Sequence, residues 1–171
     1  MTEITINGGM SMPGWFDLYD WPIGVSSKDD KEGILSSVSQ IEAEVAKLEK
    51  EGIPKSRIVL GGFSQGGAVA LLAAYHTAKE RYAGCVVLSA WLKLADEIKV
   101  SKEIAKTPLF WGHGSFDDKV LFEQQAFGVN KLTEEGVEVE ASSYPVGHSS
   151  HPQEMTAMAD FLDKILYGED E

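Results

Sequence analysis

Ser64 is the residue with the clearest potential for chemistry, because it stands at the centre of Gly62-Phe63-Ser64-Gln65-Gly66. An apolar run precedes this motif and a small-residue, apolar run follows it. Strand, sharp turn and helix in that order form the nucleophile elbow, which exposes a serine hydroxyl above an α/β sheet. Glycines are needed because the turn is strained and crowded. The motif therefore predicts a nucleophile, the alternatives being a plain glycine-rich turn or a phosphate-binding loop.

A nucleophilic serine needs a base, and the base needs a carboxylate that orients it. After this elbow the expected chain order is serine, then Asp or Glu, then His. Asp117 and Asp118 follow one apolar run, and His148 follows the next. We favour His148 over His151 because His151 stands at a predicted helix start. Spacing alone favours Asp117 only slightly over Asp118.

Other groups complete or compete with this site. The backbone N–H of Gln65, at the start of the following helix, is a candidate donor to a developing oxyanion. His113 precedes the acid in the chain and His76 lies within a helix, so we expect structural roles for both. We expect no metal, since the histidines lack the spacing of a zinc site, and no nucleotide-binding glycine motif is present.

Strands and helices alternate along the chain in a pattern that must place these residues. We predict helices at 31–51, 65–80, 123–135 and 151–166, and strands at 57–63, 85–90, 107–113 and 137–145. This alternation is typical of an α/β fold with a mostly parallel sheet and helices on both faces. In such sheets ligands bind at the carboxyl ends of the strands. We expect residues 1–171 to form a single domain.

Composition excludes several classes of function. The 171 residues carry a net charge of −12, which argues against a nucleic-acid partner. The only cysteine, Cys85, lies in an apolar run, so no internal disulfide can form and a cytoplasmic location is expected. No stretch reaches the length of a membrane span, and the first residues lack the features of a signal peptide.

Several segments, taken together, resemble the acyl-protein thioesterase / lysophospholipase family, the small carboxylesterases of the α/β-hydrolase fold. They are MSMPGWFDLY, GIPKSRIVLGGFSQGGA, LSAWL, HGSFDDKV and GHSSHPQEM. The resemblance implies a triad of Ser64, Asp117 and His148, and it selects Asp117 because the family's acid lies four residues after the histidine of the His-Gly step. It also implies Gln65 as an oxyanion donor.

The resemblance implies a function and a set of partners. The expected reaction is hydrolysis of thioesters on S-palmitoylated proteins, of lysophospholipids or of short- to medium-chain carboxylic esters, through a serine acyl-enzyme and without a cofactor. Such substrates need an apolar groove, for which we predict Trp91, Leu92, Met12 and Trp15, with Met10 and Phe16 as further candidates. Membrane contact would be at most peripheral.

The chain departs from the family at its start. Family members carry an H-G-x-G-D loop that supplies a second oxyanion N–H, and no such motif precedes Ser64. We therefore expect an N-terminally shortened α/β-hydrolase fold with a rate loss of about a hundred- to a thousandfold. Without the strand that bears this loop, the strand at 57–63 would expose an edge.

The exposed edge and the missing loop leave alternatives open. Residues 2–6 could add an edge strand, two chains could pair as a homodimer, or the form could be a shortened one; we favour the last two. As alternative functions we consider a catalytically weak acyl-chain or protein-binding module on the same fold, and an esterase with other substrates.

Overall fold

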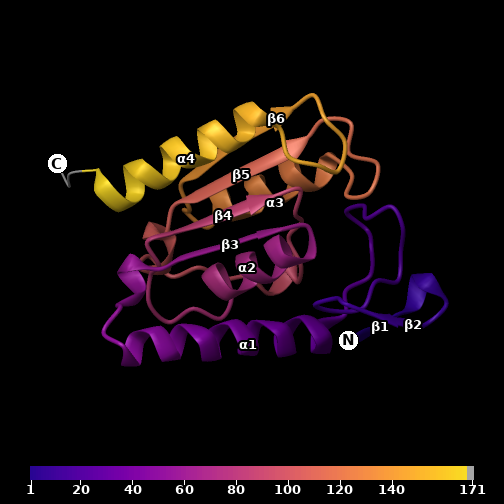
Figure 1. The fold of residues 1–171 in the computed structure, drawn as a ribbon, viewed down its shortest axis with the longest axis horizontal. Helices are drawn as coiled ribbons and strands as arrows, with labels where there is room; N and C mark the ends of the chain where they lie inside the picture. Colours follow the sequence, from indigo (N-terminus) through magenta and orange to yellow (C-terminus); the bar gives the residue numbers. More distant parts are fainter. Residues whose placement is uncertain (169–171) are drawn as a thin grey trace.

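A computed structural model describes residues 1–168, and it contains a parallel sheet and a small antiparallel ribbon (Figure 1). The sheet has the strand order β3-β4-β5-β6, and the ribbon pairs β1 with β2. The strands are β1 (Thr2–Ile4), β2 (Met10–Met12), β3 (Val59–Phe63), β4 (Gly84–Leu88), β5 (Leu109–Gly114) and β6 (Val139–Tyr144). The α-helices are α1 (Lys31–Lys50), α2 (Gln65–Tyr75), α3 (Glu123–Glu134) and α4 (Pro152–Tyr167). Single 3₁₀ turns span Thr5–Asn7, Lys55–Arg57, Ala95–Glu97 and Ile104–Lys106.

Helices cover both faces of the parallel sheet, as the sequence predicts. Side chains alternate between the faces along each strand, so that Cys85 and Val87 of β4 pack on one side and Val86 on the other. The first face forms the larger core with residues of α1, α2 and α3. The second face packs against α4 through Phe161 and its neighbours. Both faces are therefore apolar, as is typical of parallel strands.

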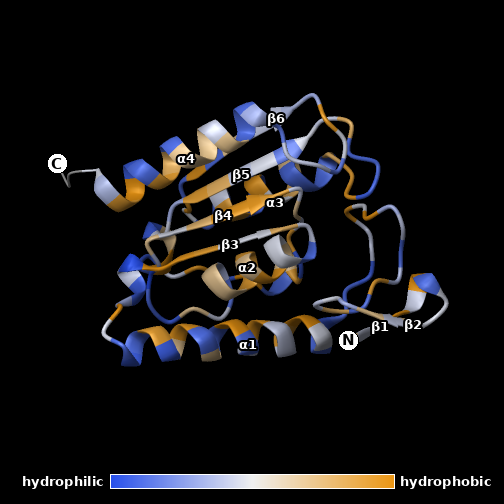
Figure 2. Cartoon of the chain, viewed as in Figure 1, coloured by the Kyte–Doolittle hydropathy of each residue, from blue (hydrophilic) through white to orange (hydrophobic). Residues whose placement is uncertain are grey.

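Helices α1 and α2 show how burial relates to sequence pattern. The side chain of Asp30 caps α1 by accepting a hydrogen bond from Gly33 N at 3.0 Å. Figure 2 shows α1 with an apolar side toward α2 and a polar side facing outward. By contrast, every residue of α2 from Gly67 to Tyr75 is buried, because α2 lies between α1 and the sheet. A helix buried all round carries no polar stripe.

Two expectations about packing need correction. Helix α2 ends at Tyr75, earlier than the predicted residue 80. In α4 the spacing of the apolar residues predicts one face with Met155, Met158, Leu162 and Ile165, but Met155 is 40% exposed, and Phe161 is buried. Residues 158, 161 and 165 form the packed row, at steps of three and four.

Strand β3 lies at the edge of the parallel sheet, with β4 as its only strand neighbour within residues 1–168. The possibility that residues 2–6 pair with this edge is wrong, because β1 pairs with β2 in the register Thr2↔Met12 and Ile4↔Met10. The ribbon lies near the start of α1 (Figure 1). The outer side of β3 therefore stays open, and Phe63 at its end is 43% exposed.

Candidate active site

Ser64 lies in a strained turn between β3 and α2. Its backbone angles are φ 55° and ψ −122°, in the positive-φ region that residues with a side chain rarely adopt. Its N–H donates to Leu88 O at 2.9 Å, which ties the turn to β4. A Cβ at Gly62 would lie 2.2 Å from the backbone carbon of Gly66, so glycine is required there. The strand-turn-helix geometry is that of a nucleophile elbow.

His148 and Asp117 form a chain of hydrogen bonds with Ser64. Nε2 of His148 lies 3.0 Å from Oγ of Ser64, and Nδ1 lies 2.8 Å from Oδ2 of Asp117. A carboxylate accepts, so Nδ1 carries the hydrogen and Nε2 is free to accept from the serine hydroxyl. The imidazole also packs against the ring of Phe63, with centroids 4.8 Å apart. This arrangement can move a proton from the hydroxyl to the imidazole.

The structure distinguishes between the two candidate acids, which follow β5, and between the two candidate bases, which follow β6. Asp117 is buried, and its Oδ1 accepts hydrogen bonds from Lys119 N and Val120 N, each at 2.9 Å. Asp118 faces outward and pairs with the ammonium of Lys119 at 3.1 Å. His151 caps α4 by accepting from the N–H of the second residue of that helix at 3.2 Å. Of these two pairs, only His148 contacts Ser64, and only Asp117 contacts His148.

A second histidine lies behind the acid. His113 is fully buried, and its Nε2 lies 2.9 Å from Val120 O and 3.5 Å from Oδ2 of Asp117. Burial lowers the pKa of His113 below its usual range, although the neighbouring carboxylate opposes this shift. Chain order predicted a structural role for His113 but not its position beside the acid. The four-residue separation from Asp117 is the signal that links the two.

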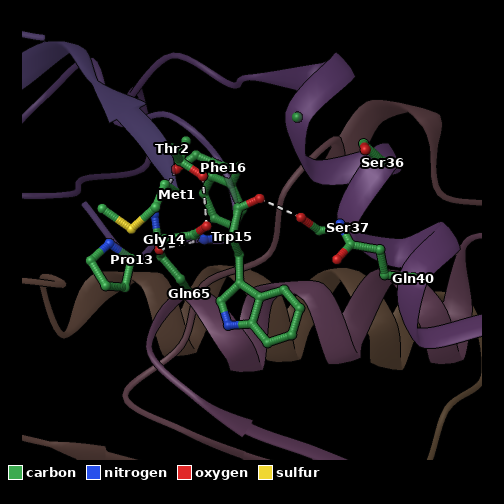
Figure 3. Close-up of a pocket in the computed structure, with 11 residues that line it drawn as sticks. Met1, Thr2, Pro13, Gly14, Trp15, Phe16, Ser36, Ser37, Gln40 and Gln65 are labelled. Atoms are coloured by element: carbon green, nitrogen blue, oxygen red, sulfur yellow. Dashed lines mark hydrogen bonds between the residues drawn. The ribbon is translucent and has the colours of Figure 1, made fainter. Parts of the chain in front are cut away.

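Gln65 is the first residue of α2, so its N–H lies among those that the helix itself does not satisfy. Its side chain forms two hydrogen bonds with a neighbouring segment, an arrangement that we call the Gln65 clamp (Figure 3). Oε1 accepts from Trp15 N at 3.1 Å, and Nε2 donates to Phe16 O at 2.9 Å. Ser37 of α1 donates to Trp15 O, which holds the same segment from the opposite side. Sequence reasoning missed this clamp.

Two cavities open on either side of Gln65. One, of about 470 Å³, has a mostly apolar lining of Ile4, Ile6, Asn7, Met12, Pro13, Leu18, Trp21 and Gln65. The other, of about 640 Å³, is more polar (Figure 3). It is lined by Met1, Thr2, Pro13, Gly14, Trp15, Phe16, Gly33, Ser36, Ser37, Gln40 and Gln65.

The structure places the four predicted groove residues differently. Met12 lines the apolar cavity and Trp15 lines the more polar one. Trp91 and Leu92, however, are only 2% and 5% exposed and belong to the core. Trp91 packs edge-on against Phe16 at 5.9 Å, and neither Trp91 nor Leu92 lines a cavity beside Gln65. Their prediction as groove residues is not supported, because the loop after β4 turns them inward.

None of the helices within residues 1–168 combines the length and the apolar composition needed to cross a membrane. Nor do three or more His, Cys, Asp or Glu side chains of residues 1–168 gather as a metal site would require. Cys85 is buried, and burial raises the pKa of its thiol well above the usual range.

Comparison with known proteins identifies the family of this chain. Residues 2–166 match the sequence pattern of the family described as phospholipase/carboxylesterase. The chain belongs to this family. Acyl-protein thioesterase 1 of Aspergillus fumigatus is 38% identical over 183 residues, which cover the whole of this chain and 75% of that protein. A probable carboxylesterase of Oryza sativa subsp. japonica is 34% identical, over 96% of this chain and 63% of that protein.

Solved structures give the same result for the fold. The crystal structure of Arabidopsis thaliana SOBER1 matches with a TM-score of 0.88 and 30% identity, over 96% of this chain and 80% of that one. Zea mays acyl-protein thioesterase 2 matches with a TM-score of 0.80 and 30% identity, over 96% and 78% of the two chains. The fold is that of an α/β-hydrolase, and the family relationship supports an esterase or thioesterase activity.

Proposed function

We propose that this family member hydrolyses acyl thioesters and carboxylic esters through a covalent acyl-enzyme on Ser64. The observation that carries the proposal is the chain of hydrogen bonds from Ser64 through His148 to Asp117, at 3.0 and 2.8 Å. The nearest alternatives in sequence, Asp118 and His151, are engaged elsewhere. Serine hydrolases of unrelated folds use this same set of three groups.

In the proposed reaction, His148 takes the proton of the Ser64 hydroxyl as the oxygen attacks the acyl carbonyl. Asp117 holds the imidazole and stabilises its charged form. The oxyanion of the tetrahedral intermediate accepts from the N–H of Gln65, at the positive end of α2. The thiolate or alkoxide then leaves with the proton from His148. Water, activated by the same imidazole, releases the carboxylic acid.

The proposed substrates are S-acylated proteins, lysophospholipids and short- to medium-chain esters. The relative named acyl-protein thioesterase 1 supports the first of these, since it is 38% identical to this chain over an alignment that covers the whole chain and 75% of the relative. The apolar cavity beside Gln65 suits an acyl chain, because Ile4, Met12 and Leu18 give it an apolar lining next to the residue that follows the nucleophile. No cofactor takes part in this scheme.

The more polar cavity would then face the rest of the substrate. We place the reaction in the cytoplasm with at most peripheral membrane contact, as the single cysteine and the composition predict. Homodimer formation through the open edge of β3 stays an expectation from the sequence.

A panel of acyl substrates tests the proposal. Wild-type protein should hydrolyse p-nitrophenyl esters of increasing chain length and an S-palmitoylated peptide, and Ser64→Ala should reduce each rate to the uncatalysed level. Circular dichroism should show that the variant is folded. Hydrolysis by folded Ser64→Ala at the wild-type rate would remove Ser64 from the mechanism.

One observation favours a second candidate, a catalytically weak acyl-chain binding module. The N–H of Trp15, on the segment facing Gln65, already donates to the Gln65 side chain, so it is not free for an oxyanion. Loss of one oxyanion donor costs about a hundred- to a thousandfold in rate. Saturable binding of a fatty acid by a folded protein without measurable turnover would favour this module.

A further inference from the structure

His113 lies directly behind the acid of the proposed site, and the reaction above gives it no task. It is the fifth residue of β5 and is completely buried. Its Nε2 lies 2.9 Å from the carbonyl oxygen of Val120 and 3.5 Å from Oδ2 of Asp117. Because a carbonyl oxygen only accepts, Nε2 carries the hydrogen, and that hydrogen lies beside the carboxylate as well.

The turn that carries Asp117 is held on two sides. Leu121 N donates to Ile23 O at 2.9 Å, and Ile23 N donates to Lys119 O at 2.8 Å, which ties the turn to the segment from the N-terminal part. On the sheet side, His113 holds the Val120 carbonyl. His113 thus connects the turn to β5 through a side chain, on the side where Oδ2 of the acid faces His148.

Burial lowers the pKa of His113 and so favours its neutral form, which can do this without adding a charge to the site. Two titratable groups face it: Asp117, which raises its pKa, and His148, which lowers it. Burial is the largest influence and lowers the pKa, while the hydrogen bond to Val120 opposes it. The ring of Phe122 covers it edge-on at 5.9 Å. A neutral imidazole donates a hydrogen bond and adds no positive charge that would compete with His148 for the carboxylate.

We propose that His113 is a positioning residue, whose Nε2–H holds the Val120 carbonyl and the Oδ2 side of Asp117 so that the carboxylate stays aimed at Nδ1 of His148. The expected effect of His113 on rate rests on the proposed function. Its expected effect on the contact between Asp117 and His148 does not depend on that function, so the positioning role and the proposed function can be tested separately.

Two substitutions of similar polarity separate positioning from packing. His113→Gln keeps an amide N–H at the same number of bonds from the backbone as Nε2. His113→Asn places its N–H where Nδ1 lies, and Nδ1 has no hydrogen-bond partner within residues 1–168. We expect His113→Asn to lower kcat at least tenfold with KM changed less than twofold, and His113→Gln to stay within threefold of wild type. His76→Gln, at a half-buried site at the end of α2, is the matched control.

Proton NMR provides a readout that needs no turnover. The downfield resonance of the His148 Nδ1–H in its hydrogen bond to Asp117 should persist in His113→Gln and be lost or broadened in His113→Asn. Equal losses of kcat in both folded variants, or a wild-type kcat and resonance in His113→Asn, would overturn the positioning role. Unimpaired hydrolysis by Ser64→Ala would instead defeat the proposed function, while the resonance would still decide the role of His113.

Discussion

The acid and base beside Ser64 lie on loops that hydrogen bonds hold at several points, whereas the cavities beside Gln65 are lined mostly by residues 1–21. Asp117 alone accepts two backbone hydrogen bonds and one from His148. In contrast, the ribbon that borders the apolar cavity has a short register and exposed side chains, with Met10 at 64% and Met12 at 38%. We call the first region the rigid half and the second, whose side chains are more exposed, the substrate half after its proposed role.

The largest expected effect concerns the rigid half. Asp117→Asn should lower kcat about ten-thousandfold, because the amide cannot hold His148 in the tautomer that accepts the serine proton. Asp118→Asn should change kcat less than threefold, since this carboxylate pairs with Lys119 at the surface. Steady-state hydrolysis of a p-nitrophenyl ester measures both. A larger loss in Asp118→Asn would show that the acid has been misassigned.

The next effect tests how tightly the elbow is packed. Gly62→Ala should destabilise the fold by about 3 kcal/mol or more, because its Cβ would lie 2.2 Å from a backbone atom. Gly66→Ala is the matched control, since its Cβ would meet only the Trp15 indole nitrogen at 3.5 Å and alanine favours helices. Urea unfolding compares the two. Equal stabilities would mean that the elbow tolerates side chains and is not rigid.

The substrate half should respond with a change in preference. Met12→Trp should fill the apolar cavity and lower kcat/KM for long acyl esters about tenfold relative to short ones, a difference of about 1.4 kcal/mol. Met10→Trp, on the same strand but outside that lining, should leave the ratio near wild type. If the two variants share one chain-length profile, the acyl chain binds elsewhere.

The smallest effect is a pH dependence of stability. The native pKa of His113 lies below its usual value of 6.5, so the unfolded state binds its proton first as the pH falls. Stability should then decline below about pH 6.5, by at most about 1.4 kcal/mol per pH unit for this group. Urea unfolding between pH 5 and 7.5 should show a shallower decline in His113→Gln. The same slope in both proteins would mean that His113 does not titrate this way.

The residues of the rigid half could be predicted from the sequence, because each lies in a short motif or follows a predicted strand. Ser64 lies in a motif with a required strand and helix, and Asp117 and His148 follow strands in the expected order. Spacing could not separate Asp117 from Asp118; the resemblance, and then the contact at 2.8 Å, did so. The helices and the strands of the parallel sheet were predicted for the same reason, apart from the early ends of α2 and β4, whereas strand β2 of the ribbon was not predicted.

The substrate half could be predicted only in part: Met12 and Trp15 line the two cavities, but most of the lining residues meet only through the ribbon and the Gln65 clamp. Ile4 and Leu18 look like ordinary apolar residues, and nothing local places them beside residue 65. Trp91 and Leu92 are buried in the core and do not line the cavities beside Gln65, because an apolar residue after a strand can turn toward a groove or toward the core. The pattern of apolar residues alone does not indicate which of these two orientations a side chain adopts.

The most direct measurement is covalent labelling with a fluorophosphonate, with the modified residue located by peptide mass spectrometry. The account predicts labelling of Ser64 in wild type, slower labelling in Asp117→Asn and none in Ser64→Ala, together with turnover of a medium-chain p-nitrophenyl ester. Folded wild-type protein that neither labels at Ser64 nor turns over ester would contradict the proposed acyl-enzyme and favour the binding module.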